Sequence, residues 1–528
     1  MRRVFSFIVA VMVTTAGVNA GVRGDVTGDD IVDVEDVNAV INLILQLPQQ
    51  NINASIADVT GDGMVDVEDV NEIINIILGH SAGPDPEPEK TGVEYVWDMD
   101  ALPEIHITVS VDEWNRLLSL YDANRGTKQY IAASRFTFIQ NGEVTEIDSI
   151  GLRLKGNTSR RRPEGNFGEM HNPENPQLRH VHFGINLRKY VKDNDHTVKG
   201  VRKLHLKWFK DDAAYVREVF CYNLFRQAGV WTASRDNYCR LWLRIGDGVE
   251  KYYGVYEMIE PIDENYLKQR ADTTMFSTSK GNLWKCKYVG QPATLAQGYD
   301  GDYWYDDDSD ANHTYMLHTN TKQFENAKAQ LIDFQLKLQG KGRESFYQWI
   351  QEVCDVDLLL KTYAVNVAVG MWDDYWNNAN NYYLYFNTED LYDYKVYFLP
   401  YDYDNTLGTS LQVGNQSDSG RQNPLEWGVQ SNKLIQRLMD YDDFRAKYIA
   451  YLKEIVADQS DLMYCTDAIE RIQAWQDKIC DYVSNDLGED MIIEDRPASW
   501  GNHHEYRLME LGPDNFFQVK AASINSLP

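Results

Sequence analysis

The spacing of apolar residues divides most of the chain into a strand-rich half and a helical half. From about Leu102 the apolar residues recur at every second position in short runs, which is typical of strands with one buried face. After about residue 320 they recur roughly every three to four positions, which is typical of amphipathic helices. We therefore predict an α+β architecture for a large domain, 100–528. The expected strands are 105–109, 150–155, 183–187, 203–207, 240–245, 252–260, 382–386 and 396–400, and the expected helices are 111–120, 215–228, 324–338, 345–353 and 356–370.

A shorter segment near the N-terminus is duplicated. The stretch 24–38 returns with most positions unchanged as 57–71, and each copy runs into a helical apolar pattern. A hard cation takes about six to eight oxygen ligands, which a twelve-residue loop supplies from positions 1, 3, 5, 7, 9 and 12. The two copies therefore predict two calcium sites. The expected ligands are Asp25, Thr27, Asp29, the Ile31 carbonyl, Asp33 and Asp36 in the first loop, and Asp58, Thr60, Asp62, the Met64 carbonyl, Asp66 and Asp69 in the second.

The duplicated loops lack an entering helix and end in Asp instead of Glu. In both respects they resemble dockerin type I repeats, which implies a small all-α calcium-binding domain over 24–80 and a cohesin-type scaffold protein as its partner. The alternative is that metal only stabilises a small stalk. Asp30 occupies the turn position where the second loop has Gly63, so we expect the second site to bind calcium more tightly. Residues 34–35 and 67–68 stand where dockerins carry partner-selecting residues, which implies a surface with two-fold pseudo-symmetry.

The segments that flank the duplicated loops indicate export and a tether. Residues 1–20 combine Arg2 and Arg3, an apolar run and a small-residue site ending at Ala20, which is typical of a signal peptide. We expect a secreted, periplasmic or cell-surface protein. No other segment approaches ~20 consecutive apolar residues, so we predict no integral membrane segment. Alternating Pro and acidic residues predict a linker over 81–95.

Charge and cysteine content narrow the classes of partner and site. The formal net charge is −29, which disfavours nucleic acid as a partner. The six cysteines include no Cys-x-x-Cys pair, which disfavours a zinc or redox motif. The chain also lacks Gly-x-Ser-x-Gly, Gly-x-x-x-x-Gly-Lys-Ser/Thr and His-Glu-x-x-His patterns, so hydrolase and P-loop NTPase interpretations have no support.

Acidic and amide residues concentrate after the predicted helix 356–370. The segment 371–381 carries Asp and Asn residues, a predicted hairpin follows, and the second strand leads into a further acidic turn, 401–408. Protein kinases place a catalytic Asp, a metal-binding Asn and a metal-binding Asp in this order. The carboxylate orients the attacking hydroxyl, and hard oxygen ligands hold Mg²⁺ against the phosphates.

Four motifs in this order, at 151–159, 253–260, 373–381 and 400–408, resemble the CotH family of spore-coat-protein-H-like atypical protein kinases over about 100–500. The resemblance implies transfer of the ATP γ-phosphoryl group to a protein hydroxyl with Mg²⁺ or Mn²⁺. It implies Asp373 as the catalytic residue, with Asp374 as the competing choice. For the metal it implies Asn381, with Asn378 or Asn380 as alternatives, and Asp402 with Asp404 close behind.

The nucleotide-binding lysine is not identified by the motifs. Gly184 and Asn186 stand on a strand where members of this family often carry lysines. Lys155 or Lys207 are the candidate substitutes. The remaining candidates for nucleotide contacts are Arg153, Glu260 as a lysine- or metal-pairing residue, and the arginines 160–162.

The altered lysine positions favour a second function class. On the same fold, the large domain could be a catalytically inactive binding or adhesion module, or an accessory component of a polysaccharide-degrading assembly. The two classes are distinguished by the response of the melting temperature to ATP and metal, because a ligand that binds the native state raises it.

Overall fold

The computed structural model describes residues 23–29, 31–45, 47, 52, 56–60, 64–77, 90–273, 275–296, 302–306, 312–409, 418–428, 433–458, 460–497 and 505–528. The predicted signal peptide, most of the predicted linker, and Asp30, Asp62 and Gly63 of the calcium loops lie outside these residues. The chain divides into two compact units, Met1–Thr91 and Gly92–Pro528.

The first unit is built on two helices, α1 (Val34–Ile44) and α2 (Val67–Ile77), which pack against each other. Helix α1 begins at a capping box, in which the Asp33 carboxylate accepts from the backbone N–H of Glu35 and the Asp36 carboxylate accepts from that of Asp33. Val40 and Ile73 are fully buried between the helices. The predicted exiting helices are therefore both present.

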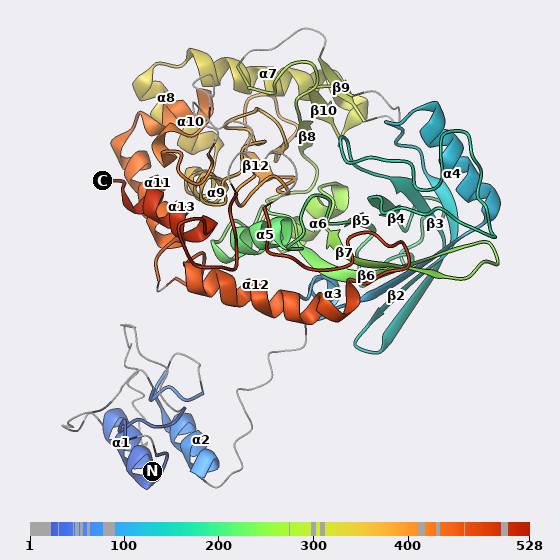
Figure 1. Ribbon diagram of the computed structural model, residues 1–528. Helices are drawn as coiled ribbons and strands as arrows, with labels where there is room; N and C mark the ends of the chain where they lie inside the picture. The colour runs from blue at the N-terminus through green and yellow to red at the C-terminus, as the bar shows by residue number, and fades with distance from the viewer. Residues whose placement is uncertain are drawn as a thin grey trace, which may run out of the picture. The chain divides into compact units, whose positions relative to one another are not determined.

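The strand-rich half of the second unit is a closed barrel of seven strands in the order β1-β2-β3-β4-β5-β7-β6 (Figure 1). All neighbouring pairs are antiparallel except β1 and β6, which run parallel and close the barrel. Helix α4 (Val111–Ala123) packs against β2. The strands are β1 (Glu104–Val109), β2 (Ile131–Gln140), β3 (Glu143–Leu154), β4 (Phe183–Asn186), β5 (Lys203–Lys207), β6 (Asp236–Ile245) and β7 (Lys251–Ile259).

A second sheet has the order β12-β11-β8-β10-β9, and its central strand β8 pairs with β11 and β10. The predicted hairpin forms its edge, since β11 pairs with β12 in antiparallel register. The sequence patterns predicted neither the barrel closure nor the strands β2, β8, β9 and β10. The strands are β8 (Asn282–Cys286), β9 (Tyr303–Tyr305), β10 (Tyr315–Leu317), β11 (Tyr382–Phe386) and β12 (Val396–Pro400).

Helices fill the other side of the second unit, with α5 lying between them and the barrel (Figure 1). Helix α9 is almost entirely buried and packs against α11, α5 and β12. The helices are α3 (Gly92–Val96), α5 (Arg217–Gln227), α6 (Glu264–Asp272), α7 (Phe324–Gly340), α8 (Arg343–Val353), α9 (Val356–Ala368), α10 (Lys433–Met439), α11 (Asp442–Ile455), α12 (Cys465–Ile479) and α13 (Phe516–Asn525). Short 3-10 helices occupy Thr321–Gln323, Pro424–Glu426 and Cys480–Tyr482. Among the described residues, none of these helices combines the length and apolar character needed to cross a bilayer.

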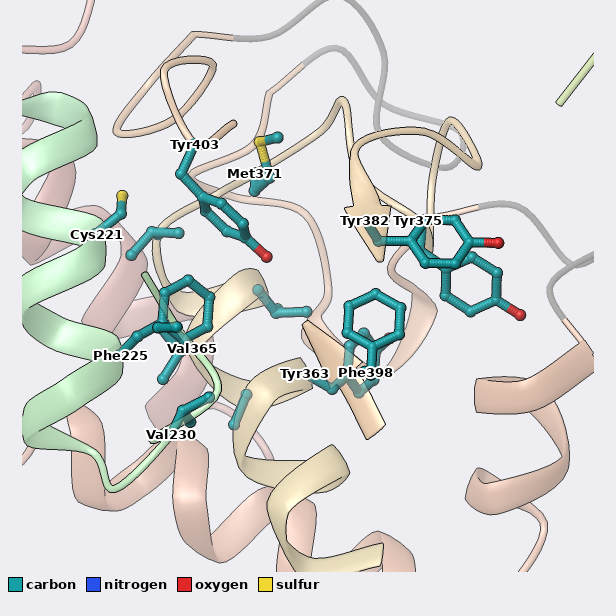
Figure 2. Close-up of a cluster of buried hydrophobic side chains, with 14 of the residues drawn as sticks. Cys221, Phe225, Val230, Tyr363, Val365, Met371, Tyr375, Tyr382, Phe398 and Tyr403 are labelled. Atoms are coloured by element: carbon teal, nitrogen blue, oxygen red, sulfur yellow. The ribbon is translucent and has the colours of Figure 1, made fainter. Parts of the chain in front are cut away.

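An aromatic core joins α5, α9 and the β11–β12 hairpin (Figure 2). The Tyr382 and Phe398 rings stack with centroids 5.0 Å apart, and the Phe225 ring of α5 meets the Tyr403 ring edge-on at 4.8 Å. Such pairs add about 0.5–1.5 kcal/mol each beyond the burial of their area. This core packs the turn that follows β12 against the middle and last turns of α5, where Tyr222 and Phe225 contact Tyr403. All six cysteines are described, and each is a free thiol.

Candidate functional site

A buried lysine and three carboxylates meet where the barrel contacts the helical half. Lys207 is the last residue of β5, and its Nζ lies 2.8 Å from Asp402 Oδ1 and 3.3 Å from Asp404 Oδ2. The same Nζ donates to Glu218 Oε2. The side chain of Lys207 is 7% exposed, so its charge depends on these partners and not on water. We call Lys207, Glu218, Asp402 and Asp404 the carboxylate–lysine cluster.

Helix α5 and the turn after β12 hold the cluster together through the backbone. Glu218 lies in the first turn of α5, and its Oε1 accepts from the Tyr403 backbone N–H at 3.1 Å. The Asp402 backbone N–H donates to the Tyr222 hydroxyl at 3.1 Å. Asp402 has φ +64°, a left-handed conformation that is costly for a residue with a Cβ and that clusters at functional sites. The turn is therefore fixed by α5 and not by its own preferences.

Charge–charge interactions decide the ionisation of Lys207 and Asp402, whereas burial raises the pKa of Glu218 and raises that of Asp404 to about 7. Burial alone would lower the pKa of Lys207, but the carboxylates of Asp402 and Asp404 raise it well above its ordinary value. Desolvation likewise opposes ionisation of Asp402, but the Lys207 and Lys155 ammonium groups hold the pKa of Asp402 well below its usual range. Glu257, which faces Lys207 in register on β7, is buried, and this burial raises its pKa well above the ordinary value.

Asp373 lies in a separate group of amides after α9. Its Oδ1 accepts from the side-chain amide of Asn378 and, at 3.0 Å, from that of Asn380. Its Oδ2 accepts from the Asn381 amide at 3.1 Å. Burial raises the pKa of Asp373 to about 6, and the charges of Asp402 and Asp404 contribute further to this rise. Asp373 is therefore within electrostatic range of the carboxylate–lysine cluster.

Asp374, the competing choice for the catalytic residue, belongs to the interior instead. Its side chain accepts from the Asn377 backbone N–H at 2.7 Å and from the Asn366 side-chain amide. Asn366 in turn accepts from the Tyr403 hydroxyl at 2.8 Å. Asp374 is 2% exposed, and burial raises its pKa to about 7. The geometry thus favours Asp373 over Asp374 as a residue that a substrate can reach.

Three carboxylates of the cluster have the chemistry and the spacing to hold a divalent cation. Oxygen atoms of Glu218, Asp402 and Asp404 all lie within 4.8 Å of one another. Hard carboxylate oxygens are the ligands that Mg²⁺ and Mn²⁺ prefer. The residues present therefore fit the metal that the sequence predicts. Of the predicted pair Asn381 and Asp402, Asp402 belongs to this group of carboxylates, and the side-chain N–H of Asn381 donates to Asp373.

Glu260 lies in a different ion-pair network from the one expected. Its Oε1 is 3.0 Å from Arg235 Nη1, and its Oε2 is 3.0 Å from Arg270 Nη2. Although burial opposes it, Arg270 and Arg235 hold the pKa of Glu260 below its ordinary value. Glu260 therefore pairs with arginines, and the expectation of a lysine partner is wrong. Glu218 is the residue that pairs with the lysine.

The arginine triplet 160–162 also has internal partners. Arg160 donates to the Thr127 carbonyl at 2.7 Å, and Arg162 binds Asp122 with Nε and Nη2 at 2.8 and 2.9 Å. Arg161 pairs with Glu489 and lies over the Trp208 ring. These contacts tie the long β3–β4 connection to α4, to the loop that follows α4 and to the segment after α12. Each arginine of the triplet therefore has internal partners, and the phosphate contact considered from sequence stays a prediction.

The remaining predicted basic residues lie beside the cluster. Lys155 follows β3, and its Nζ is 5.6 Å from the centre of the Tyr401 ring. Arg153 lies over Tyr130 and over Gly184, where a Cβ would come within 3.3 Å of the Arg153 side chain. A larger side chain than glycine at position 184 would therefore require the Arg153 side chain to shift by a few tenths of an ångström.

The described parts of the two calcium loops share one geometry. In the first loop, Asp36 Oδ1 accepts from the Thr27 backbone N–H at 2.8 Å. In the second, Asp69 Oδ1 accepts from that of Thr60 at 3.0 Å. Asp36 and Asp69 are fully buried, so each loop already folds around the carboxylate at position 12. Asp25, Asp29, Asp33, Asp58 and Asp66, with the Ile31 and Met64 carbonyls, complete the described candidate ligands, and this oxygen-rich set fits calcium.

The sequence interpretation missed Glu218 and Lys285. Glu218 had a usable signal, because a strand ending in lysine precedes a helix that begins with Arg-Glu, the order in which kinases form a Lys–Glu pair. Lys285 had none, because β8 was not predicted. The Lys285 Nζ lies 4.4 Å from the centre of the Tyr401 ring, which the Lys155 Nζ also approaches.

Comparison with known protein families agrees with both units. The dockerin type I domain family matches residues 23–78, and dockerin type I domains bind Ca²⁺. The family described as CotH kinase protein matches residues 152–507. A search of curated proteins finds no match to this chain. Because the second match spans more than half of the sequence, the chain belongs to the CotH kinase family and carries an N-terminal dockerin type I domain.

Proposed function

We propose that this chain is an exported phosphotransferase that moves the γ-phosphoryl group of ATP to a hydroxyl group of a protein. The observation that carries this proposal is the pairing of Lys207 with Glu218 and Asp402, with Asp373 within electrostatic range. A lysine–glutamate pair, a metal-binding carboxylate and a separate carboxylate near the acceptor are the groups that protein kinases require.

Asp373 is the proposed acceptor of the hydroxyl proton. In the reaction, the bond between the γ-phosphorus and its bridging oxygen breaks, a bond to the acceptor oxygen forms, and ADP leaves. The three surrounding asparagine amides orient the Asp373 carboxylate. A pKa of about 6 is closer to neutrality than that of an ordinary aspartate, which suits a residue that must accept a proton near pH 7.

Glu218, Asp402 and Asp404 are the proposed holders of Mg²⁺ or Mn²⁺, which supplies positive charge to the transferred phosphates when bound. Lys207 contacts all three carboxylates and offsets their mutual repulsion. We propose that Lys207 retains its contact with Glu218 when the cation is bound, since Glu218 is the most deeply buried of the three.

The test is phosphoryl transfer from labelled ATP by the full chain with Mg²⁺ or Mn²⁺. We expect incorporation into protein that is lost in Asp402→Ala and Asp373→Ala. Asp393→Ala, on an exposed position of the β11–β12 connection, is the matched control. Absence of transfer by the wild type, or activity that survives Asp402→Ala, contradicts the proposal.

A non-catalytic binding module, such as an adhesin or an accessory part of a polysaccharide-degrading assembly, is the second candidate. The observation that favours it is the sequence of β4, which carries Gly184 and Asn186 where lysines are expected. This candidate predicts that ATP and metal leave the melting temperature unchanged.

For the first unit we propose calcium-dependent docking to a cohesin-type protein. Val34 and Val67 begin the two helices and are 64% and 63% exposed. Ile41 and Ile74, at equivalent positions, are 36% and 38% exposed. The two helices thus present matched apolar residues, which supports a surface with two-fold pseudo-symmetry. Binding of a cohesin that is lost on chelation of calcium tests this proposal.

A further inference from the structure

A buried glutamate on β7 lies beside the carboxylate–lysine cluster. Glu257 stands opposite Lys207 in register, where β5 and β7 run antiparallel. Residues opposite each other in such a pair project from the same face of the sheet, with Cβ atoms about 5 Å apart. Glu257 is 2% exposed, and its Oε1 accepts no hydrogen bond from any residue that the structure describes. A buried carboxyl oxygen without a partner is costly, so its place next to a lysine requires an explanation.

Lys207 lies between an open side and a closed side of the cluster. Its partners Asp402 and Asp404 have side chains that are 33% and 44% exposed. Its third partner, Glu218, has a side chain that is 4% exposed, and Glu257 is buried to a similar degree. A cation from solution therefore reaches the two aspartates first, whereas the two glutamates are shielded from water.

Lys207 and a divalent cation would compete for the same carboxylates. The Lys207 Nζ lies 2.8 Å from Asp402 Oδ1 and 3.3 Å from Asp404 Oδ2, and both aspartates belong to the proposed metal site. Occupation of that site therefore costs Lys207 two of its three carboxylate partners. A buried ammonium group needs counter-charges, and Glu257 is a carboxyl group that faces it from the neighbouring strand.

The charges around Glu257 change in the direction that supports such an exchange of partners. Burial raises the pKa of Glu257 well above its ordinary value, the Glu218 carboxylate raises it further, and Lys207 opposes the rise. The charge of Glu218 is offset when the metal site is filled, and an ammonium group that moves closer to Glu257 favours its charged form. Both changes make Glu257 a better partner for Lys207.

We propose that Glu257 is a positioning residue that receives Lys207 when the metal site is filled. In the metal-free chain, Lys207 binds all three carboxylates of the cluster. With the cation bound, Lys207 keeps Glu218 and exchanges the two aspartates for Glu257. This inference rests on the proposed metal site. It gives the unpartnered glutamate of β7 a role, because the aspartates become free to bind the cation while the buried ammonium group keeps two counter-charges.

The test is calorimetric titration of the full chain with Mn²⁺, with calcium present to occupy the dockerin loops. Asp402→Ala should abolish the Mn²⁺ signal, which identifies that signal with the cluster. Glu257→Gln keeps the size of the side chain and removes its charge, so it should weaken Mn²⁺ binding about tenfold, because a hydrogen bond between charged groups is lost. Glu257→Asp keeps the charge and should weaken Mn²⁺ binding less.

Glu260→Gln is the matched control. Glu260 is buried and directly follows β7, but it pairs with Arg235 and Arg270 and not with Lys207. Its substitution should leave the Mn²⁺ affinity of the folded chain unchanged.

A second measurement separates positioning from a structural role. The metal-free melting temperature of Glu257→Gln should equal that of the wild type, since Glu257 Oε1 has no hydrogen bond to lose. Saturating Mn²⁺ should raise the melting temperature of the wild type more than that of the variant. A crystal structure of the Mn²⁺-bound chain should show the Lys207 Nζ within hydrogen-bond distance of Glu257.

The outcomes separate this inference from the proposed function. Equal Mn²⁺ affinity in the wild type and Glu257→Gln overturns the inference, and so does equal weakening in Glu257→Gln and Glu260→Gln. No Mn²⁺ binding by the wild type removes both the metal site and the exchange of partners. Mn²⁺ binding that depends on Glu257 without phosphoryl transfer keeps the inference and removes the proposed activity. Transfer that needs Asp402 but not Glu257, with unchanged Mn²⁺ affinity, removes the inference alone.

Discussion

Lys207 Nζ lies 2.8 Å from Asp402 Oδ1, although the two residues are 195 positions apart in the chain. One ends a strand of the barrel, and the other follows the last strand of the second sheet. The contact therefore fixes the barrel to the second sheet at one point. It also places a permanent positive charge among the carboxylates that are proposed to hold the metal.

Replacement of Lys207 by Met should destabilise the chain and abolish phosphoryl transfer. It leaves three carboxylates close together with no counter-charge, and breaking a buried ion pair costs about 3–5 kcal/mol. Chemical denaturation measures the loss of stability. The matched control is Lys203→Met, at the exposed end of β5, where the loss should be about 1 kcal/mol or less. Equal losses in the two variants would show that Lys207 is not the key ion-pair partner.

Asp373→Asn and Asp374→Asn should have opposite effects. Asp373→Asn keeps the shape of the residue but removes the proton acceptor, so transfer should fall by about 100-fold or more with little change in melting temperature. Asp374→Asn disturbs a buried network with Asn366 and Asn377 and should cost about 1–3 kcal/mol of stability. The measurements are labelled-ATP transfer and chemical denaturation. The reverse pattern would assign the catalytic role to Asp374.

Glu260→Gln should lower stability but not the activity of the folded fraction. The substitution leaves Arg235 and Arg270 without their buried carboxylate, at a cost of about 3–5 kcal/mol. Glu264→Gln, on an exposed position of α6, is the control and should be close to neutral. If the Glu260 variant instead melts normally and fails to bind ATP, the nucleotide role expected from sequence is restored.

The effect of Lys520→Met on stability should depend on pH. The Lys520 side chain is buried in the folded chain and exposed to water in the unfolded chain. Burial lowers its pKa from 10.5 to about 7 in the folded state. As the pH falls from 10.5 to 7, the Lys520 amine is protonated in the unfolded chain but not yet in the folded chain. The free energy of unfolding therefore falls by up to about 1.4 kcal/mol per pH unit. Below pH 7 the loss is constant.

The free energy of unfolding of Lys520→Met, relative to that of the wild type, should therefore be higher at pH 7 than at pH 9.5. Urea denaturation at both pH values measures this difference. Lys447→Met is the control, because that side chain is 57% exposed. A stability difference between the Lys520 variant and the wild type that is the same at both pH values would show that Lys520 stays charged when folded.

The two calcium sites should be unequal. Asp30 occupies the turn position of the first loop and Gly63 that of the second, and glycine adopts the sharp turn at lower cost. Asp58→Ala should therefore reduce the measured calcium affinity of the full chain more than Asp25→Ala. Calcium titration by calorimetry gives both values. Equal losses would show that the turn residue does not set the ranking.

Features with local causes were predictable from the sequence. The calcium loops and their exiting helices were found because the ligand spacing, the capping Asp33 and the apolar pattern all lie within a few residues of one another. The β11–β12 hairpin and helices α7, α8 and α9 followed from periodicity alone.

The tertiary structure decided the barrel closure and the composition of the site. Closure needs β1 to pair with β6, which lies more than one hundred residues later, and no local pattern encodes that pairing. The choice of Lys207, Asp373 and Glu218 over their sequence neighbours depends on which side chains face the junction between the barrel and α5. The sequence by itself thus determined the residue types that the chemistry needs and their order along the chain. Only the fold decided which of them meet, because burial and contact between remote strands are properties of the packed chain.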